Sequence, residues 1–306
     1  YEGALAAFER QPMVRVLFDN GAGVSPTFRR TPGNPYAGFE RSYSSWPIDG
    51  TKAQTWYFGP GGTLRDNPPS TEGVDTYRSD PKALPLRNYG DNTGGGGLWG
   101  NASQWDWKWQ QNPAGTAVSY VSQPLMTDTT VVGAGAAYVW AKSSAPDVDF
   151  QVTISEVRSD GNETFVQNGY MRGSERVLSA DSNNLFKQRS TLLNPIPTFR
   201  AADASPMPGD RFVQVAIPLY YQGHVYRHGS RIRVTIAGPN GAQPVWSFSQ
   251  SVPVGTVSIG YSAIYPSKLV LPVIPSSPAP TPPPLCPSLR NQPCRPYQAI
   301  VNRQGS

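Results

Sequence analysis

The strongest constraint on the fold is a period of two residues that recurs between residues 115 and 275. Short runs there alternate apolar and polar side chains, which is the pattern of a half-buried β-strand. In DFQVTISEV, for example, Phe150, Val152 and Ile154 share one face. The SDGN sequence at 159–162 is typical of a hairpin turn. Seven such runs follow one another without a helical pattern between them, so we expect seven or eight antiparallel strands.

The run SRIRVTIAG, residues 230–238, makes a more specific prediction about one of these strands. Ile232, Val234 and Ile236 alternate there with polar residues, among them Arg233. We expect the three apolar side chains to face the core and the arginine to face solvent, because successive side chains of a strand point to opposite sides.

Glycine and proline are unusually frequent, with 30 and 32 of the 306 residues. They interrupt nearly every window that could form a helix, and they suit short strands joined by long turns. We therefore expect an all-β chain in three parts. A loop-rich connecting segment with few strands spans 1–114, a jelly-roll β-sandwich spans 115–275, and a proline-rich tail spans 276–306.

The connecting segment has a few recognisable elements. Its first ten residues, YEGALAAFER, resemble the end of a helix, and strands are predicted at 12–18 and 53–59. About half of all the glycines lie at 19–100. Because this segment has little core of its own to bury, we expect it to be ordered by packing against something larger. The chain opens without Met or a secretory leader, so we also expect it to come from within a longer polypeptide.

The two cysteines, Cys286 and Cys294, lie in CPSLRNQPC within the proline-rich tail. A metal site would need further ligands, and the neighbouring sequence offers none. A local disulfide that closes a small loop is the favoured interpretation. Because disulfides persist in oxidising compartments, we expect a secreted or extracytoplasmic protein.

Charge and hydropathy narrow the range of partners. The net charge is +5, and the 26 Lys and Arg residues are dispersed rather than clustered, so we expect no nucleic-acid partner. There is no apolar run of about 18 residues, so we expect no membrane-spanning helix.

Candidate catalytic residues are few, and none meets the requirements of a hydrolase nucleophile or base. Ser262 in GYSAI lacks the second glycine and the following helix of a nucleophile elbow. His224 and His228 are the chain's two histidines, at the start of a strand run and in a turn. Such histidines are more often hydrogen-bonded structural residues than bases. We predict no catalytic residue in this chain.

The stretch WDWKWQQ is the strongest candidate for ligand contact. Trp105, Trp107 and Trp109 alternate with polar residues, so a strand here would present three indoles on one face. Such a face suits stacking against sugar rings. The alternative is that the indoles cover an apolar surface on a neighbouring domain.

A second candidate is the acidic pair Asp147 and Asp149 in APDVDF. Two carboxylates at this spacing could contribute to a Ca²⁺ site. They could equally cap a turn or pair with an arginine. We predict no resident cofactor, with Ca²⁺ as the exception that this pair leaves open.

Several stretches, taken together, resemble a known family. In order they are RSYSSWPI, WYFGPGGTL, DTYRSDPKALP, the long run from VSYVSQPL to ISEVRSDG, GYMRGSER and HVYRHGSRIRVTIAG. Over residues 12 to 275 the chain is similar to the C-terminal region of the CocE/NonD hydrolases, the α/β-hydrolases of X-Pro dipeptidyl-peptidase and cocaine-esterase type. The resemblance implies a jelly roll of the galactose-binding-like type, packed on a hydrolase domain.

The resemblance also implies that the catalytic residues belong to a different domain. In the family, the catalytic Ser, Asp and His precede this region, and none of their motifs is present here. The expectation is a non-catalytic β-sandwich of a secreted serine hydrolase acting on acyl, ester or X-Pro peptide bonds. It would support the catalytic domain, border the substrate approach or mediate contacts between copies. The hydrolase domain would belong to the same polypeptide or to a separate chain, which leaves open whether this chain is part of an enzyme. The alternative is a stand-alone carbohydrate-binding module that uses the tryptophan cluster.

Overall fold

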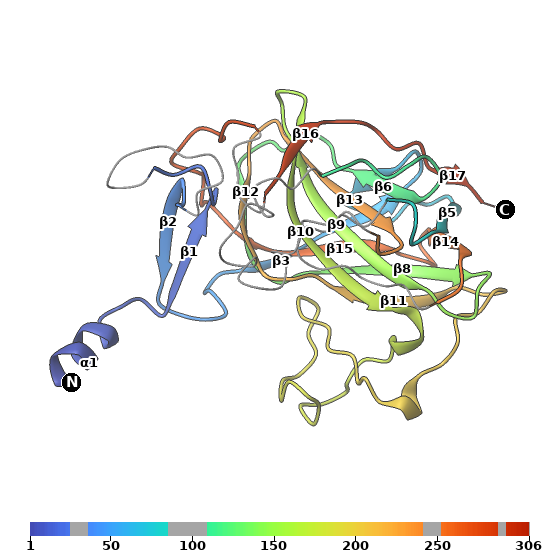
Figure 1. The fold of residues 1–306 in the computed structure, drawn as a ribbon, viewed down its shortest axis with the longest axis horizontal. Coiled ribbons are helices and arrows are strands. Elements are labelled where there is room, and N and C mark those ends of the chain that lie inside the picture. Colours follow the sequence, from blue (N-terminus) through green and yellow to red (C-terminus); the bar gives the residue numbers. More distant parts are fainter. Residues whose placement is uncertain (25–35, 85–108, 241–251, 287–291, 306) are drawn as a thin grey trace, which may run out of the picture.

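The structure, a computed structural model, describes residues 1–24, 36–84, 109–240, 252–286 and 292–305. One α-helix, α1 (Glu2–Glu9), precedes an almost entirely β fold (Figure 1). Two short 3-10 turns, η3 (Gly173–Glu175) and η4 (Ala201–Asp203), lie in a long connection. The strands are β1 (Val14–Phe18), β2 (Phe39–Tyr43), β3 (Lys52–Gly59), β4 (Thr63–Arg65), β5 (Gly73–Ser79), β6 (Ala117–Val121), β7 (Thr129–Gly133), β8 (Ala136–Ser143), β9 (Asp149–Val157), β10 (Asn162–Arg172), β11 (Val213–Pro218), β12 (Gln222–Tyr226), β13 (Arg231–Ala237), β14 (Gly255–Tyr261), β15 (Lys268–Ile274), β16 (Cys294–Pro296) and β17 (Arg303–Gln304).

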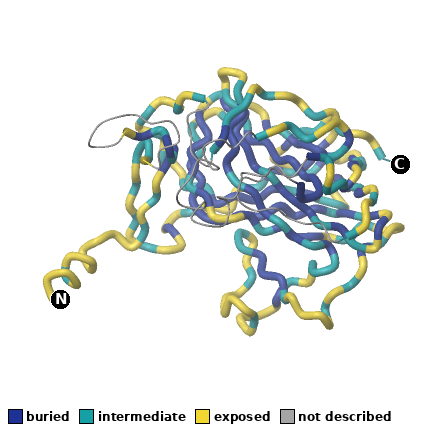
Figure 2. The backbone as a smooth tube through the Cα atoms, viewed as in Figure 1, coloured by how far each residue is buried: buried dark blue, intermediate teal, exposed yellow. Residues whose placement is uncertain are grey.

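The main body is a sandwich of antiparallel strands. One layer has the order β16-β10-β9-β13-β6, and the other contains β3-β15-β8-β14-β5-β17 with β11 paired to β8. Strand β4 links the layers, because it pairs with β3 and, in parallel, with β6. Side chains of both layers form one apolar core, which Figure 2 shows as the buried centre of the molecule. The predicted all-β sandwich is confirmed.

The alternating pattern of β9 gives the expected burial. Phe150, Val152 and Ile154 are fully buried in the core. The predicted hairpin turn at 159–162 is also present, since Val157 of β9 pairs with Glu163 of β10. Turn chemistry and side-chain period are local properties of the sequence, so both could be predicted without knowledge of the rest of the fold.

Arg233 contradicts the prediction that it faces solvent, because its side chain is completely buried. Its guanidinium donates to Glu163 Oε2 at 2.9 Å and to Ser119 Oγ at 2.8 Å. The ring of Tyr297 lies 5.2 Å from the guanidinium carbon. The face that the strand pattern assigns to solvent is therefore covered by the C-terminal tail.

Ten described strands lie between residues 115 and 275, where the sequence predicts seven or eight. Two predicted runs each divide into two strands, β7 with β8 and β14 with β15. The stretch that contains His224 forms a further strand, β12. The sheet also includes β3, β4 and β5 from the segment at 1–114, and β16 and β17 from the tail at 276–306.

A separate two-stranded hairpin, β1–β2, stands beside the sandwich, with α1 extending from it (Figure 1). Strand β1 packs on β12 so closely that a Cβ at Gly223 would collide with Val16. A small apolar cluster fills this junction; its buried members are Phe18, Ile48, Val132 and Val225. Helix α1 has no buried residue.

Candidate functional site

Four charged or titratable side chains meet where the hairpin joins the sandwich. Arg227 Nη2 donates to Asp19 Oδ2 at 2.5 Å, so the residue after β1 is tied to the residue after β12. The Arg227 backbone N–H donates to Glu156 Oε1 at 2.8 Å. Glu156 Oε2 lies 2.8 Å from His224 Nε2. All four side chains are buried or nearly so, and we call Asp19, Glu156, His224 and Arg227 the hairpin-anchoring cluster.

The pKa values of the two carboxyls in this cluster shift in opposite directions overall. Burial raises the pKa of Glu156, but hydrogen bonds from His224 and from the Arg227 backbone outweigh it, so the pKa is lowered overall. For Asp19, burial outweighs the attraction of Arg227, and the pKa is raised. His224 is only 3% exposed, and its second ring nitrogen faces Gln292 Nε2 at 3.4 Å. The cluster is enclosed, so this geometry suits structural pairing rather than proton exchange with a substrate.

Aromatic rings and arginines continue this anchoring toward the surface. The rings of Phe18 and Phe39 stack at 4.8 Å between their centroids. The guanidinium carbon of Arg41 lies 5.4 Å from the centre of the Phe39 ring, and that of Arg227 lies 5.9 Å away. Arg41 also donates to the backbone oxygen of Ser277 at 3.0 Å, so the start of the tail is fastened to the hairpin.

A second buried cluster lies under the tail. Glu163 accepts hydrogen bonds from Arg233 at 2.9 Å, from Arg295 at 3.0 Å and from the Ser155 hydroxyl at 2.6 Å. Trp109 stacks on this cluster, with its ring centre 3.5 Å from the Arg295 guanidinium carbon. One predicted ligand-contacting indole is therefore engaged within the domain. Trp105 and Trp107 lie outside the described residues.

Cys286 and Cys294 are joined by a disulfide, as the sequence predicts, and their Cα atoms are 5.4 Å apart. Cys294 begins β16, which pairs with the first residues of β10. The bridge therefore holds the tail beside Arg295 and the second buried cluster.

Ser262 and His228 both take part in hydrogen bonds that stabilise turns. Ser262 is buried directly after β14, and its Oγ accepts the backbone N–H groups of Ile264 and Tyr265 at 3.1 and 3.0 Å. His228 is exposed in the turn before β13, where its backbone N–H donates to Asp128 at 2.8 Å. The two residues thus stabilise turns in different parts of the fold.

The acidic pair is also engaged. Asp147 accepts hydrogen bonds from the backbone N–H and the hydroxyl of Ser174, at 3.0 and 2.7 Å. Asp149 pairs with Arg172 at 2.8 Å. Among the described residues no group of three or more His, Cys, Asp or Glu side chains is placed to hold a metal ion. Calcium binding at this pair stays a prediction.

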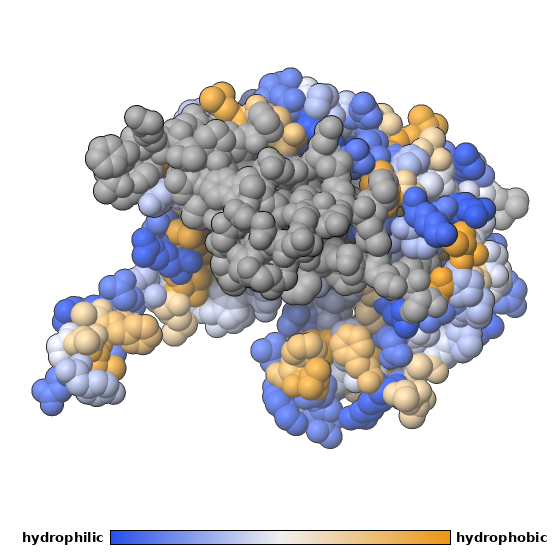
Figure 3. All heavy atoms as spheres, viewed as in Figure 1, coloured by the Kyte–Doolittle hydropathy of each residue, from blue (hydrophilic) through white to orange (hydrophobic). Residues whose placement is uncertain are grey.

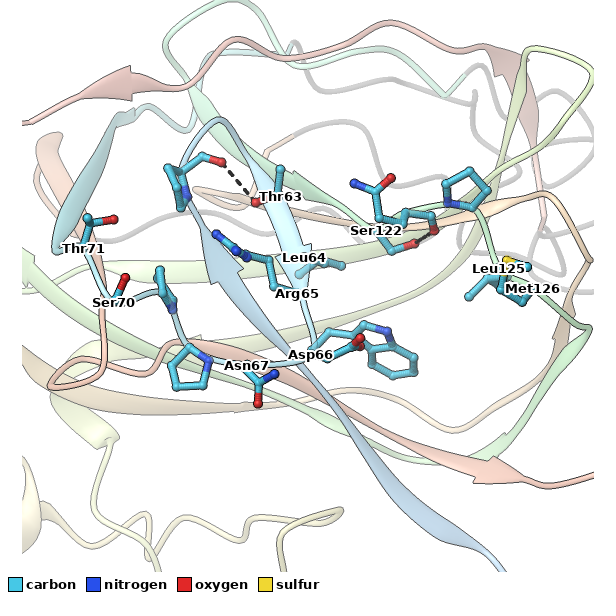
Figure 4. A pocket seen from close by; sticks show the side chains of 16 residues that line it. Thr63, Leu64, Arg65, Asp66, Asn67, Ser70, Thr71, Ser122, Leu125 and Met126 are labelled. Atoms are coloured by element: carbon cyan, nitrogen blue, oxygen red, sulfur yellow. Dashed lines mark hydrogen bonds between the residues drawn. The ribbon is translucent and has the colours of Figure 1, made fainter.

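An open groove of about 860 Å³ lies between residues 63–71 and residues 122–126. Figure 4 shows Arg65, Asp66 and Asn67 on one side of it and Ser122 and Met126 on the other. Two hydroxyl hydrogen bonds stabilise its walls: Thr63 to the Pro60 oxygen and Ser122 to the Gln123 oxygen. The sequence indicates a tight turn here but gives no sign of the groove, because the two walls are about 60 residues apart.

Residues 6–245 match the family model of the X-Pro dipeptidyl-peptidase C-terminal non-catalytic domain, PepX_C. The chain belongs to this family. The resemblance to the C-terminal region of the CocE/NonD hydrolases is thereby confirmed, and the chain is a PepX_C domain of this hydrolase type.

None of the helices in the described residues has the length and apolar character needed to cross a membrane.

Curated relatives of this PepX_C domain are longer proteins. A putative serine esterase of Mycobacterium bovis is 27% identical over 76% of this chain and 35% of its own length. The cocaine esterase of a Rhodococcus species is 26% identical over 65% of this chain and 32% of its own. The chain thus spans about a third of the length of the curated relatives it matches.

Solved structures share the fold. A CocE/NonD family hydrolase from Staphylococcus aureus has a TM-score of 0.59 at 20% identity, over 78% of this chain and 39% of that one. An α-amino acid ester hydrolase has a TM-score of 0.52 at 19% identity, over 79% and 42%. The sequence indicates the family but gives no sign of the hairpin-anchoring cluster of the PepX_C domain, because Asp19 and Arg227 are 208 residues apart.

Proposed function

We propose that this PepX_C domain supports the α/β-hydrolase domain of a secreted serine hydrolase, and that α1 with the outer side of the β1–β2 hairpin is the surface that contacts it. The parent enzyme would cleave acyl, ester or X-Pro peptide bonds. The observation that carries the proposal is the exposure of α1, a helix in which no residue is buried.

Isolated helices of eight residues are marginal in water, because few hydrogen bonds repay the cost of nucleation. Helix α1 nevertheless carries Phe8, which is 74% exposed, and is followed by Met13, which is 72% exposed. Leu17, on the hairpin, is also exposed. Figure 3 shows apolar side chains gathered on this projecting helix. Such a surface is expected where another domain packs.

The hairpin is suited to this role because it is held firmly from behind. The Asp19–Arg227 ion pair and the stacked Phe18 and Phe39 rings fix its inner side to the sandwich. A rigid hairpin with an apolar outer edge would hold the partner domain in one orientation, and the PepX_C domain would then border the substrate approach.

A secreted location is part of the same proposal. The Cys286–Cys294 disulfide supports it, because structural disulfides are rare in reducing compartments.

The proposal divides into two tests. In the first, the purified chain is incubated with a fluorophosphonate probe and with a p-nitrophenyl ester. We expect neither labelling nor turnover, because the probe requires an activated serine. Stoichiometric labelling would contradict a non-catalytic role.

In the second test, the immobilised chain is the bait for fluorophosphonate-labelled polypeptides from the secreted fraction of its source organism. We expect capture of a labelled hydrolase, and loss of capture with the Phe8→Glu, Met13→Glu double variant. The control is Met126→Glu, at an 83% exposed position in the groove of Figure 4, which should capture as well as the parent chain. Equal capture by all three would refute the assigned surface.

The carbohydrate-binding alternative stays a hypothesis. The engagement of Trp109 by Arg295 does not favour it. Its test is a calorimetric titration with oligosaccharides. Binding to the parent chain that is lost in Trp107→Ala would support carbohydrate binding.

A further inference from the structure

A pocket of about 320 Å³ opens beside the end of β7, and Ile48 and Val132 of the junction cluster form part of its lining. Its walls come from the turn that contains Trp46, from Tyr221 before β12, from Pro272 of β15 and from the loop at 188–194. Most of the lining is apolar. The volume lies at the lower end of the range for small-molecule sites, so the pocket suits a compact ligand.

Two aromatic side chains stand at the mouth of this pocket. The rings of Trp46 and Tyr221 are 5.7 Å apart at an interplanar angle of 46°. Trp46 is 44% exposed and Tyr221 58% exposed, whereas Trp56 of the core is 7% exposed. A flat apolar ligand placed against these rings would remove part of their surface from water, which is the main source of affinity in such sites.

A glycine keeps the pocket open. Gly133 has φ +126°, a conformation that side-chain-bearing residues rarely adopt. A Cβ at this position would lie 3.2 Å from Pro272 Cγ and 3.5 Å from the Trp46 ring. Any larger residue would therefore fill the space between the proline and the indole.

The rim of the pocket is preformed. Thr191 and Asn194 exchange backbone hydrogen bonds at 3.0 and 3.2 Å. The hydroxyl of Tyr138, on β8, donates to the backbone oxygen of Leu192 at 2.9 Å and so ties this loop to the sandwich. Asn184 Nδ2 donates to the Gln188 oxygen at 2.7 Å. Because this loop is already ordered, binding of a ligand would not carry the entropic cost of ordering it.

The charge at the rim selects the ligand. Arg189 lines the pocket, and its guanidinium has no ion-pair partner in the part of the chain that the structure describes. Among the described residues, no Asp or Glu lines the pocket. An apolar pocket that has the exposed Arg189 at its rim is complementary to a carboxylate on an apolar body, since arginine pairs with carboxylates through two parallel hydrogen bonds. We infer that this pocket binds a small hydrophobic carboxylate, an aryl or acyl acid.

The probes are 2-naphthoate and its uncharged isostere 2-naphthamide, titrated calorimetrically into the whole chain. We expect naphthoate to bind about tenfold more tightly than the amide, because only the acid pairs with the arginine. Arg189→Gln should reduce naphthoate affinity to the level of the amide and leave the amide unchanged. Trp46→Ala should weaken both. The matched control is Arg200→Gln, whose side chain lies outside the pocket and bonds to the Asn183 oxygen, and it should change neither.

Each other result overturns the inference. Equal affinity of acid and amide, or naphthoate binding that survives Arg189→Gln, would exclude carboxylate recognition. No binding of either probe at millimolar concentration would exclude a ligand site. Self-association of the chain that is lost in Trp46→Ala, without naphthoate binding, would assign the pocket to a second copy. None of these readouts depends on the hydrolase partner, so failure here is distinguishable from failure of the proposed function.

Discussion

Glu156 Oε2 lies 2.8 Å from His224 Nε2, although the strands that carry them are not hydrogen-bonded to each other. Strand β9 pairs with β10 and β13, whereas β12 pairs with β7. A buried side-chain contact therefore joins strands that the backbone ladder leaves separate. Through Arg227 the same contact extends to Asp19 and to the hairpin.

The lowered pKa of Glu156 predicts a specific loss of stability in acid. The folded-state pKa lies below its ordinary value of 4.5, so the carboxylate contributes stability above that value and loses it as the pH falls through the lowered pKa. Glu156→Gln should cost about 3–5 kcal/mol at neutral pH, because it disrupts a buried pair. Urea unfolding from about pH 7 down to about pH 3 should show this difference shrinking below about pH 4.5.

The control for this experiment is Glu72→Gln, at an exposed position. Its unfolding free energy should follow that of the parent chain throughout. If Glu156→Gln and the parent give parallel curves over the whole range, the Glu156 carboxylate does not contribute in the way described.

Asp19→Asn should loosen the hairpin without unfolding the sandwich. Asp19 has φ +50°, which asparagine also tolerates, so the substitution removes charge with little change in backbone conformation. Because Arg227 then lacks a charged partner, we expect amides of β1 to exchange with deuterium about 10- to 100-fold faster, and those of β13 to exchange unchanged. The control is Asp49→Asn, at an exposed position. Uniform acceleration across both strands would show that the ion pair stabilises the whole domain instead.

Glu163 and Arg233 should be strongly coupled. Both side chains are fully buried, so Glu163→Gln or Arg233→Met alone should each cost about 3–5 kcal/mol, and the two together much less than the sum. Denaturant unfolding of the four proteins measures the coupling, which we expect to exceed about 1 kcal/mol. The exposed pair Arg15 and Glu40 is the control, and its coupling should stay below about 1 kcal/mol. Additive effects at Glu163 and Arg233 would contradict the pairing.

The disulfide should stabilise the tail by a moderate amount. Cys286 and Cys294 are eight positions apart, and closing so short a loop contributes about 2–3 kcal/mol in the chain-entropy account. The double variant Cys286→Ser, Cys294→Ser should therefore unfold at lower denaturant concentration while keeping the same sheet signal. Reductant should destabilise the parent chain but not this variant. Alkylation of both thiols without reductant, read by intact mass, would rule the bridge out.

The sequence by itself determined the strand class, the core face of β9 and the hairpin turn that follows it. These are local properties: a side-chain period of two residues and turn chemistry operate over a few positions, whatever surrounds them. The disulfide between Cys286 and Cys294 was also accessible, because it lies within one short stretch. The family was accessible from several short stretches taken together, in their order along the chain.

Only the tertiary structure decided which polar faces are buried. The strand pattern around Arg233 assigns its side chain to solvent, but Tyr297 and Arg295, more than 60 residues later, cover it and bring it against Glu163. The pocket with Trp46 and Arg189 likewise joins segments about 140 residues apart. Burial depends on what packs from elsewhere in the chain, and the period of a single strand carries no information about that packing.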